Sequence, residues 1–459
     1  MRSISRARFD ALAAHTRRAA VFAMAQEIAW FDADDGRVIA TIIADTDGEF
    51  SGAILARDLL ERFRWIDHTS YYDTPEEAIA ELHQKLLEIV PNIDELRIQG
   101  DETGKPADFF TPISSTEKLH PSFRTLTSEK AYTAARRMID SMMRWHEDVD
   151  GNFVQQFQTD GFDARLWELY LFAVLAEANL DVMHPKPAPD FLAQSLGGEF
   201  AMEATTIGLS GGKNAEATTP QAPRNEEEYL QYMHHYLPIK YAGPLTKKLG
   251  KGYWKRASAI DKPLVFAIQD FHAPMSMTYS GHALPVYLYG YTHEAITKDG
   301  KLKIVPTKIT EHKWGKKIVP SGFFSLPDAK HVSAVIFNSS GTISKFNRMG
   351  VAAGFGSDDV VLVHRGQRWN QDSNASTPTS FLAVVTEGYP ETWIEGMDVF
   401  HNPNALHPLA PELLPGAAHH RLMADGNIET IGPDWKPIRS TTSNVTFSGP
   451  QQEESLPNA

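Results

Sequence analysis

The stretch DARLWELYLFAVLAEAN, residues 163–179, decides how the central part of this chain folds. Its apolar residues cover nearly every direction of a 3.6-residue helix, which is typical of a helix that is buried on all sides. Glu168 interrupts this apolar surface, and burying an unpaired carboxylate is costly. Arg165, three residues earlier, can pair with it. The pattern therefore fits either a structural ion pair or a carboxylate that is held in place for a function.

Two further carboxylates follow within forty residues. Asp190 stands in a Pro-Asp-Phe sequence after a proline-rich approach, and residues 199–206 predict a strand after the turn at Gly197-Gly198. Because side chains alternate along a strand, Glu203 shares a face with Ala201 and Thr205. We expect Asp190 and Glu203 to lie on neighbouring strands. Two carboxylates at close range repel unless a cation lies between them, and carboxylate oxygens suit Mg²⁺ or Mn²⁺.

This arrangement of residues resembles the PD-(D/E)XK, or restriction-endonuclease-like, phosphodiesterase superfamily. The resemblance rests on Pro189-Asp190, on Glu203-Ala204-Thr205 thirteen residues later, and on Glu168 in a preceding helix. It covers about 100 residues and implies a core of one helix, three antiparallel strands, a second helix and a further strand. It also implies that Asp190 and Glu203 bind the metal, while Glu168 assists catalysis. The run 151–168 further resembles bacterial proteins of similar length, without implying an activity.

The sequence departs from the superfamily pattern at the third motif position. The family usually has lysine there, which polarises the attacking water, and this chain has Thr205. We expect the basic group to come from elsewhere, with Lys240 preferred over Lys247 and Lys213, and with Gln269 as another polar contributor. Without such a group the site can bind without cutting.

A basic stretch runs from Lys240 to Arg256 without an acidic residue. Such a stretch is either a solvated surface or a local phosphate-binding face, and the latter can exist on an acidic protein. On the second interpretation four of its lysines bind nucleic acid: Lys247, Lys248, Lys251 and Lys255.

The rest of the chain predicts a mixed α/β protein of several units. Residues 1–120 indicate a small α+β accessory unit and linker, with a helix that begins after Thr74 and has Pro75 at its first position. Residues 121–350 indicate the nuclease-like α/β core, a mixed sheet flanked by helices. They include a helix expected over 127–147, and the segment Thr342 to Gly350 is expected to be a polar loop. Residues 351–459 indicate a strand- and turn-rich C-terminal extension with a disordered tail.

Composition narrows the class of protein. The 459 residues include no cysteine, which excludes disulfides, thiolate metal sites and cysteine nucleophiles. No apolar run reaches the length of about 20 residues that a membrane span needs, and no targeting segment is visible. We therefore expect a cytoplasmic protein without a membrane partner. The formal net charge of −14 argues against attraction of nucleic acid by the protein as a whole.

These observations favour a metal-dependent endonuclease that hydrolyses DNA or RNA. A role in restriction or phage defence follows from the resemblance only. The alternative is a catalytically inactive nuclease-like fold that binds nucleic acid or a protein. An unrelated α/β enzyme, in which the three carboxylates lie apart, is a third possibility. The N-terminal unit is a candidate surface for self-association or for a partner protein. The sequence contains no P-loop, no dinucleotide fingerprint and no histidine pattern typical of zinc sites.

Overall fold

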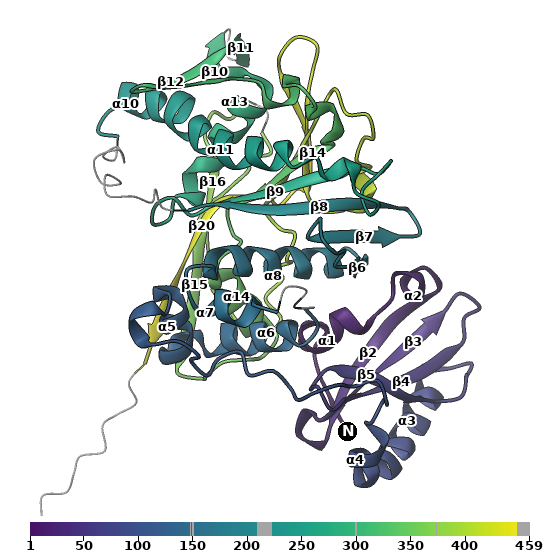
Figure 1. Cartoon of the computed structure of the whole chain (residues 1–459). Coiled ribbons are helices and arrows are strands. Elements are labelled where there is room, and N and C mark those ends of the chain that lie inside the picture. Colours follow the sequence, from purple (N-terminus) through teal and green to yellow (C-terminus); the bar gives the residue numbers. More distant parts are fainter. Residues whose placement is uncertain (147, 149–150, 209–222, 299–300, 373, 448–459) are drawn as a thin grey trace, which may run out of the picture.

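An eight-stranded mixed sheet forms the centre of the computed structural model, which describes residues 1–146, 148, 151–208, 223–298, 301–372 and 374–447 (Figure 1). Its spatial order is β19-β18-β17-β14-β9-β8-β7-β6. In chain order its strands are β6 (Asp181–Met183), β7 (Phe191–Ser195), β8 (Gly198–Ile207), β9 (Leu264–Asp270), β14 (Ala334–Asn338), β17 (Met397–His401), β18 (Ala418–Leu422) and β19 (Ile428–Ile431).

The direction of these strands follows the connections between them. β6, β7 and β8 form an antiparallel meander, whereas β8, β9 and β14 run parallel to one another. Every residue of β9 and β14 is buried, as expected for parallel strands with helices on both faces. The prediction of a mixed α/β class is confirmed.

Helices cover both faces of this sheet (Figure 1). α8 packs on one face and α11 on the other, and both contact β8. The helices of this part of the chain are α5 (Pro121–Ser128), α6 (Thr133–Met143), α7 (Phe153–Gln158), α8 (Phe162–Glu177), α10 (Glu226–Gln231), α11 (Leu237–Gly250), α12 (Met277–Ser280), α13 (Leu284–Tyr289) and α14 (Ile343–Ala352).

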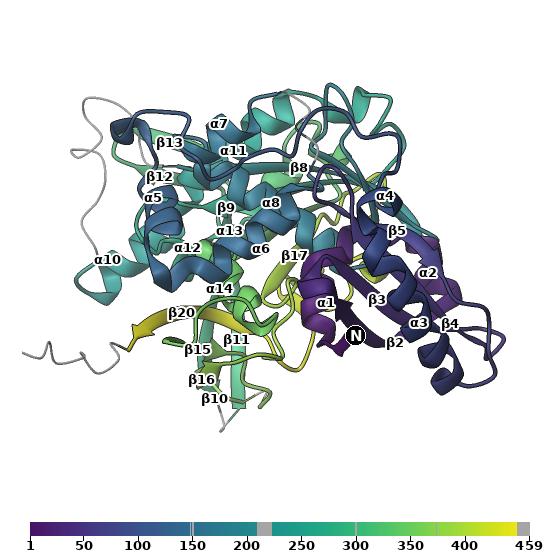
Figure 2. The same cartoon turned by 90° about the horizontal axis from the view of Figure 1, so that it is seen from below.

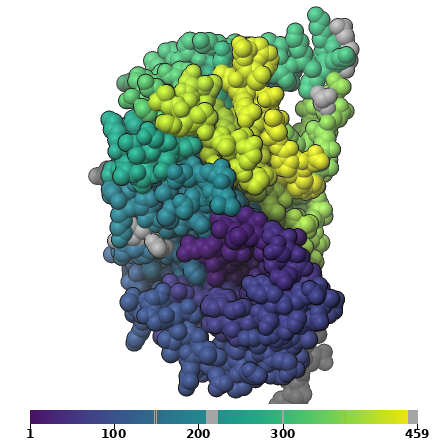
Figure 3. Space-filling model, turned by 90° about the vertical axis from the view of Figure 1, so that its right-hand side faces the viewer, coloured from purple at the N-terminus to yellow at the C-terminus, as the bar shows by residue number. Residues whose placement is uncertain are grey.

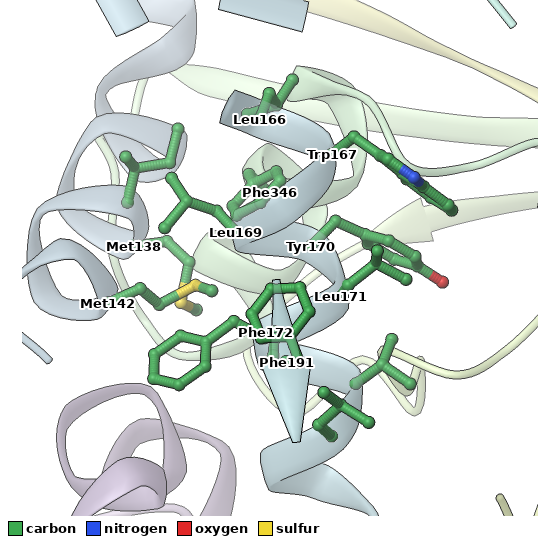
Figure 4. Close-up of a cluster of buried hydrophobic side chains, with 14 of the residues drawn as sticks. Met138, Met142, Leu166, Trp167, Leu169, Tyr170, Leu171, Phe172, Phe191 and Phe346 are labelled. Carbon is green, nitrogen blue, oxygen red and sulfur yellow. The ribbon is translucent and has the colours of Figure 1, made fainter. Parts of the chain in front are cut away.

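The α8 helix is the centre of the largest apolar core, as its sequence predicts (Figure 4). Trp167 and Tyr170 are fully buried, and each polar atom finds a backbone carbonyl. The Trp167 indole N–H donates to Ala267 on β9 at 3.2 Å, and the Tyr170 hydroxyl donates to Trp393 at 2.8 Å. Truncating a buried tryptophan of this kind to alanine costs about 3–5 kcal/mol. α8 therefore fixes the position of Glu168 rigidly.

The N-terminal unit has its own five-stranded sheet, in the order β1-β2-β3-β4-β5. Its apolar core lies between this sheet and α3. As predicted, α3 begins after Thr74, whose hydroxyl accepts a hydrogen bond from the Glu77 amide. α1 packs against α6, and Ile39, Leu55 and Phe63 belong to the same apolar core, so the unit is joined to the core through α1 and its sheet (Figure 2). Its elements are β1 (Arg2–Ser3), α1 (Arg6–Ala13), α2 (Ala19–Met24), β2 (Ala25–Ala33), β3 (Val38–Asp45), β4 (Phe50–Arg57), β5 (Phe63–His68), α3 (Pro75–Ile89) and α4 (Ile93–Leu96).

The segment after residue 350 differs from the predicted extension. β17, β18 and β19 complete the central sheet, and the antiparallel β14–β17 pair joins them to the core. The C-terminal part, yellow in Figure 3, accordingly packs against earlier segments rather than standing apart. The remaining strands are β10 (Tyr291–Lys298), β11 (Lys301–Lys308), β12 (Glu311–Trp314), β13 (Lys317–Pro320), β15 (Val360–Arg368), β16 (Thr379–Val385) and β20 (Pro437–Thr446).

Two local predictions were wrong. The helix expected over 127–147 is divided between α5 and α6, and Thr127 and Ser128 lie in the last turn of α5, where their hydroxyls donate to backbone carbonyls. The polar loop expected from Thr342 to Gly350 is helix α14. Among the described residues, no helix combines the length and the apolar character that crossing a bilayer requires.

Candidate functional site

Glu203 is the centre of the candidate site. It lies in the middle of β8, and its side chain shares the α11 face of the sheet with Ala201. One carboxylate oxygen, Oε1, accepts hydrogen bonds from the Lys248 ammonium and, at 2.6 Å, from the Tyr253 hydroxyl. The other oxygen, Oε2, is buried and has no hydrogen-bond partner among the described residues. The carboxylate is therefore held from one side and open on the other.

Asp190 is the cross-strand neighbour of Glu203. β7 begins at Phe191, which pairs with Met202, so the same register places Asp190 opposite Glu203. The ladder between the two strands stops there, and the Asp190 carboxylate accepts the Ala204 amide at 2.7 Å. Burial, followed by repulsion from Glu203 and Glu168, raises the pKa of Asp190 to about 7. The predicted pair of carboxylates on neighbouring strands is present.

Glu168 approaches this pair from α8. Its carboxylate accepts a hydrogen bond from Arg165 at 2.5 Å, so the structural ion pair considered from the sequence exists. Burial nevertheless raises the pKa of Glu168. Arg165 and Lys248 oppose this shift, and Glu203 adds to it. Glu168 therefore acts electrostatically on Asp190 and Glu203, but within the described residues the three carboxylates do not form one group that could hold a metal ion.

The basic group of the site is Lys248, whereas Lys240 was expected. α11 connects the parallel strands β8 and β9, so it runs antiparallel to both and its last turns lie over the first half of β8. Lys248 is in that part of α11. Lys240, about 12 Å earlier along the helix axis, lies over the ring of Tyr236 at 5.4 Å, near Asp270 at the opposite end of the strands. The prediction that Lys240 is the basic group that orients water was therefore wrong in position.

The sequence contains a signal that could have identified Lys248. The buried residues Tyr241, Leu245 and Leu249 form one stripe of α11, and Lys248 falls on that stripe at the seventh position after Tyr241. A lysine inside an apolar stripe requires an anionic partner. Tyr253 was missed as well. It follows Gly252, whose φ of 61° ends the helix in the left-handed conformation that glycine favours.

The other predicted lysines border this cluster. Lys247, Lys251 and Lys255 are exposed, whereas Lys248 is mostly buried, with 18% of its side chain exposed. The ammonium of Lys251 lies 5.8 Å from the centre of the Tyr253 ring, and Tyr253 itself bonds Glu203. The exposed lysines thus continue outward from the carboxylates.

Two further candidates do not join the site. Lys213 lies outside the described residues. Gln269 is buried and connects two strands, because its amide donates to Asn338 at 2.5 Å while its oxygen accepts the Asp270 amide at 2.9 Å. Its role is structural.

The donor set fits a hard divalent cation. Asp190 and Glu203 offer carboxylate oxygens, and the buried Oε2 of Glu203 has no hydrogen-bond partner among the described residues. Within the described ranges, no three or more histidine, aspartate or glutamate side chains already surround a metal-sized space. Mg²⁺ is commonly held by one or two carboxylates together with water and substrate oxygens, so two carboxylates suffice.

Comparisons with known proteins bring no relative to this site. No family model matches the sequence, and no curated protein and no solved structure matches it either. The function of the carboxylate cluster is therefore inferred from its own residues.

Proposed function

We propose that this protein is a metal-dependent phosphodiester hydrolase that acts on DNA or RNA. The observation that carries the proposal is the pairing of Asp190 and Glu203 across β7 and β8, with Lys248 bonded to Glu203. The order α8, three antiparallel strands, α11 and the parallel strand β9 also agrees with the core that the PD-(D/E)XK resemblance implies.

Asp190 and Glu203 would hold Mg²⁺ or Mn²⁺, which when bound stabilises the charge that develops on a phosphate. Lys248 carries a proton on Nζ within reach of Glu203, so it is placed to orient a water molecule or to contact a phosphate oxygen. Tyr253 keeps the Glu203 carboxylate in one orientation through its hydroxyl. Glu168, fixed by Arg165, adds negative charge that favours cation binding.

The exposed lysines support nucleic acid as the substrate class. Lys247, Lys251 and Lys255 lie on α11 and just after it, in the same stretch as Lys248, which bonds Glu203. Lysines in such a row bind the phosphate backbone without reading the base sequence. A role in bacterial restriction or phage defence is proposed from the family resemblance alone.

The test is a cleavage assay with the full chain. Plasmid DNA, single-stranded DNA and RNA are incubated with Mg²⁺, Mn²⁺ or EDTA. We expect cleavage that requires a divalent cation and that is lost in Asp190→Asn and Glu203→Gln. Lys248→Met should lose at least about 100-fold in rate, whereas Lys240→Met, the matched control on the same helix, should cut at the wild-type rate.

Two outcomes would contradict the proposal. If Mn²⁺ binds through Asp190 and Glu203 but no substrate is cut, the chain is a binding module that has lost catalysis. If folded protein neither cuts nor binds a cation, the carboxylate cluster is structural. Melting temperatures of all variants show whether a loss of activity comes from unfolding.

A further inference from the structure

A second site lies at the carboxyl ends of β9 and β14. These parallel neighbours end at Asp270 and Asn338, and a cavity of about 520 Å³ opens beyond them. Crevices at the carboxyl ends of parallel strands are common ligand sites in α/β proteins. This volume falls in the range of small-molecule pockets, roughly 300–1,000 Å³. The cavity is outside the carboxylate cluster, because Glu203 is not among its lining residues.

The chain that leaves β14 gives the cavity a polar wall. Ser339, Ser340, Thr342 and Ser344 all line it, as residues of the turn into α14 and of that helix's first turn. Within the described residues no side chain caps the first turn of α14. The free N–H groups of a helix start favour an anion.

Ser340 provides an independent indication of a ligand. The residue is only 8% exposed. Its amide donates to the Asn338 side chain at 2.7 Å, but its hydroxyl has no hydrogen-bond partner in the described parts of the chain. Because Ser340 lines the cavity, its hydroxyl is available to bond a ligand there.

A guanidinium group reaches the cavity from α14. Lys345 and Arg348, on α14, both bond Glu391 at 2.7 Å, and all three side chains are almost fully buried. Glu177 and Glu395 also act on these cations, so the charges beneath the turn are balanced, and Arg348 is the cation that itself lines the cavity. Arg348 also donates to Thr442, which lines the cavity, at 2.6 Å. Among the described residues that line the cavity, Asp163 is the one carboxylate. Burial raises the pKa of Asp163, and His120, which also lines the cavity, opposes that shift.

The opposite wall is apolar. Leu166 from α8, Phe271 after β9 and Ile343 of α14 line it, together with two methionines. A ligand that fits both walls carries an anionic group at one end and a ring at the other. We propose that this cavity binds a phosphate monoester with an aromatic group, of the size of a nucleoside monophosphate. The phosphate would meet Ser340 and the start of α14, and the ring would lie against the apolar wall.

The test is calorimetric titration of the full chain with AMP, adenosine and inorganic phosphate in EDTA, so that no divalent cation takes part. We expect AMP to bind at least about tenfold tighter than either fragment. Ser340→Asp should weaken AMP binding by at least about tenfold through charge repulsion, and Ser340→Ala should weaken it less. Ser376→Asp, which adds the same charge in an exposed loop, is the matched control and should not change the affinity.

The test distinguishes this site from the carboxylate cluster. Glu203→Gln should bind AMP with unchanged affinity. The proposal is overturned if no phosphate compound binds at about 5 mM, or if AMP binds Ser340→Asp as well as wild type. It is also overturned if AMP and inorganic phosphate bind equally, because the apolar wall then contributes nothing. A negative result in this titration does not contradict the hydrolase proposal, because the two sites are separate.

Discussion

Replacing Lys248 with methionine tests the electrostatic coupling of the carboxylate cluster directly. Methionine keeps most of the length of the side chain but removes the ammonium that bonds Glu203. After this change, Arg165 remains as a cation that acts on the carboxylates. These carboxylates are Glu168, Asp190 and Glu203.

The expected cost follows from the burial of the pair. Removing one partner of a buried ion pair typically costs about 3–5 kcal/mol. The Glu203 side chain is 5% exposed and the Lys248 side chain 18% exposed, so water screens the pair slightly. We therefore expect Lys248→Met to lower the free energy of unfolding by about 2–4 kcal/mol. The double variant Lys248→Met/Glu203→Gln should recover most of this loss, because the uncompensated charge is gone.

A divalent cation should partly replace the missing ammonium. If Mn²⁺ binds the variant tenfold tighter than it binds wild type, it adds about 1.4 kcal/mol more stability to the variant at saturation. Denaturant titration followed by tryptophan fluorescence, with and without Mn²⁺, measures both effects. The readout does not depend on enzymatic activity.

Lys262→Met is the matched control. It removes a partly exposed pair, Lys262–Glu199 at 2.7 Å, and should cost about 1 kcal/mol or less. The reasoning fails if Lys248→Met is no less stable than this control, because the carboxylates would then not depend on Lys248. It also fails if Mn²⁺ stabilises wild type and Lys248→Met by the same amount, because the ammonium and the cation would then not share one site.

Two further predictions concern the surface lysines and a buried carboxyl. Replacing Lys247, Lys251 and Lys255 by alanine should make the negative slope of log K against log salt less steep by about 2–3, for single- or double-stranded nucleic acid and without sequence preference. An unchanged slope, measured by fluorescence anisotropy, would place the binding face elsewhere. Burial raises the pKa of Glu395 to about 7, although the Trp435 indole donates to it at 3.2 Å. Because the pKa of Glu395 in the folded protein lies above its ordinary value of 4.5, ionisation of Glu395 destabilises the folded state. Its destabilising effect should grow from pH 4.5 to pH 7 and stay constant above. Glu395→Gln should therefore be more stable than wild type at pH 8, by up to about 2 kcal/mol, and equal to it near pH 4; a difference that does not change with pH would refute this assignment.

Local sequence patterns predicted much of the site. The apolar run of α8 and the alternation along β8 predicted the elements that carry Glu168 and Glu203, because helical and strand periodicity determine which side chains share a face, whereas Asp190 lies just before β7. Lys248 could not be chosen by composition, since five lysines stand close together in one stretch. The apolar stripe of α11 distinguishes Lys248 as the buried lysine, but its position over Glu203 depends on the direction of α11 relative to β8, which follows from the parallel pairing of β8 and β9.

Long-range pairing was the main source of error elsewhere. The segment Thr342 to Gly350 seemed polar because of Lys345 and Arg348, but their partner Glu391 is more than forty residues away in the chain. Paired with that carboxylate, both cations are buried and the helix is part of the core. The strands β17 to β19 likewise join the central sheet through contacts with β14, which no local pattern encodes.

The register of β7 and β8 explains why threonine can occupy the position where the PD-(D/E)XK pattern has lysine. The ladder ends at the Phe191–Met202 pair, so the Ala204 amide is available for the Asp190 carboxylate. Thr205 then lies one strand repeat beyond Glu203 and on the same face, under α11. Lys248 covers that face from the helix and already bonds Glu203. A lysine at position 205 would place a second ammonium beside the first, and like charges at close range repel. On the proposed function, Lys248 on α11 supplies the basic group that the PD-(D/E)XK pattern has on the strand, so a lysine at position 205 is not needed.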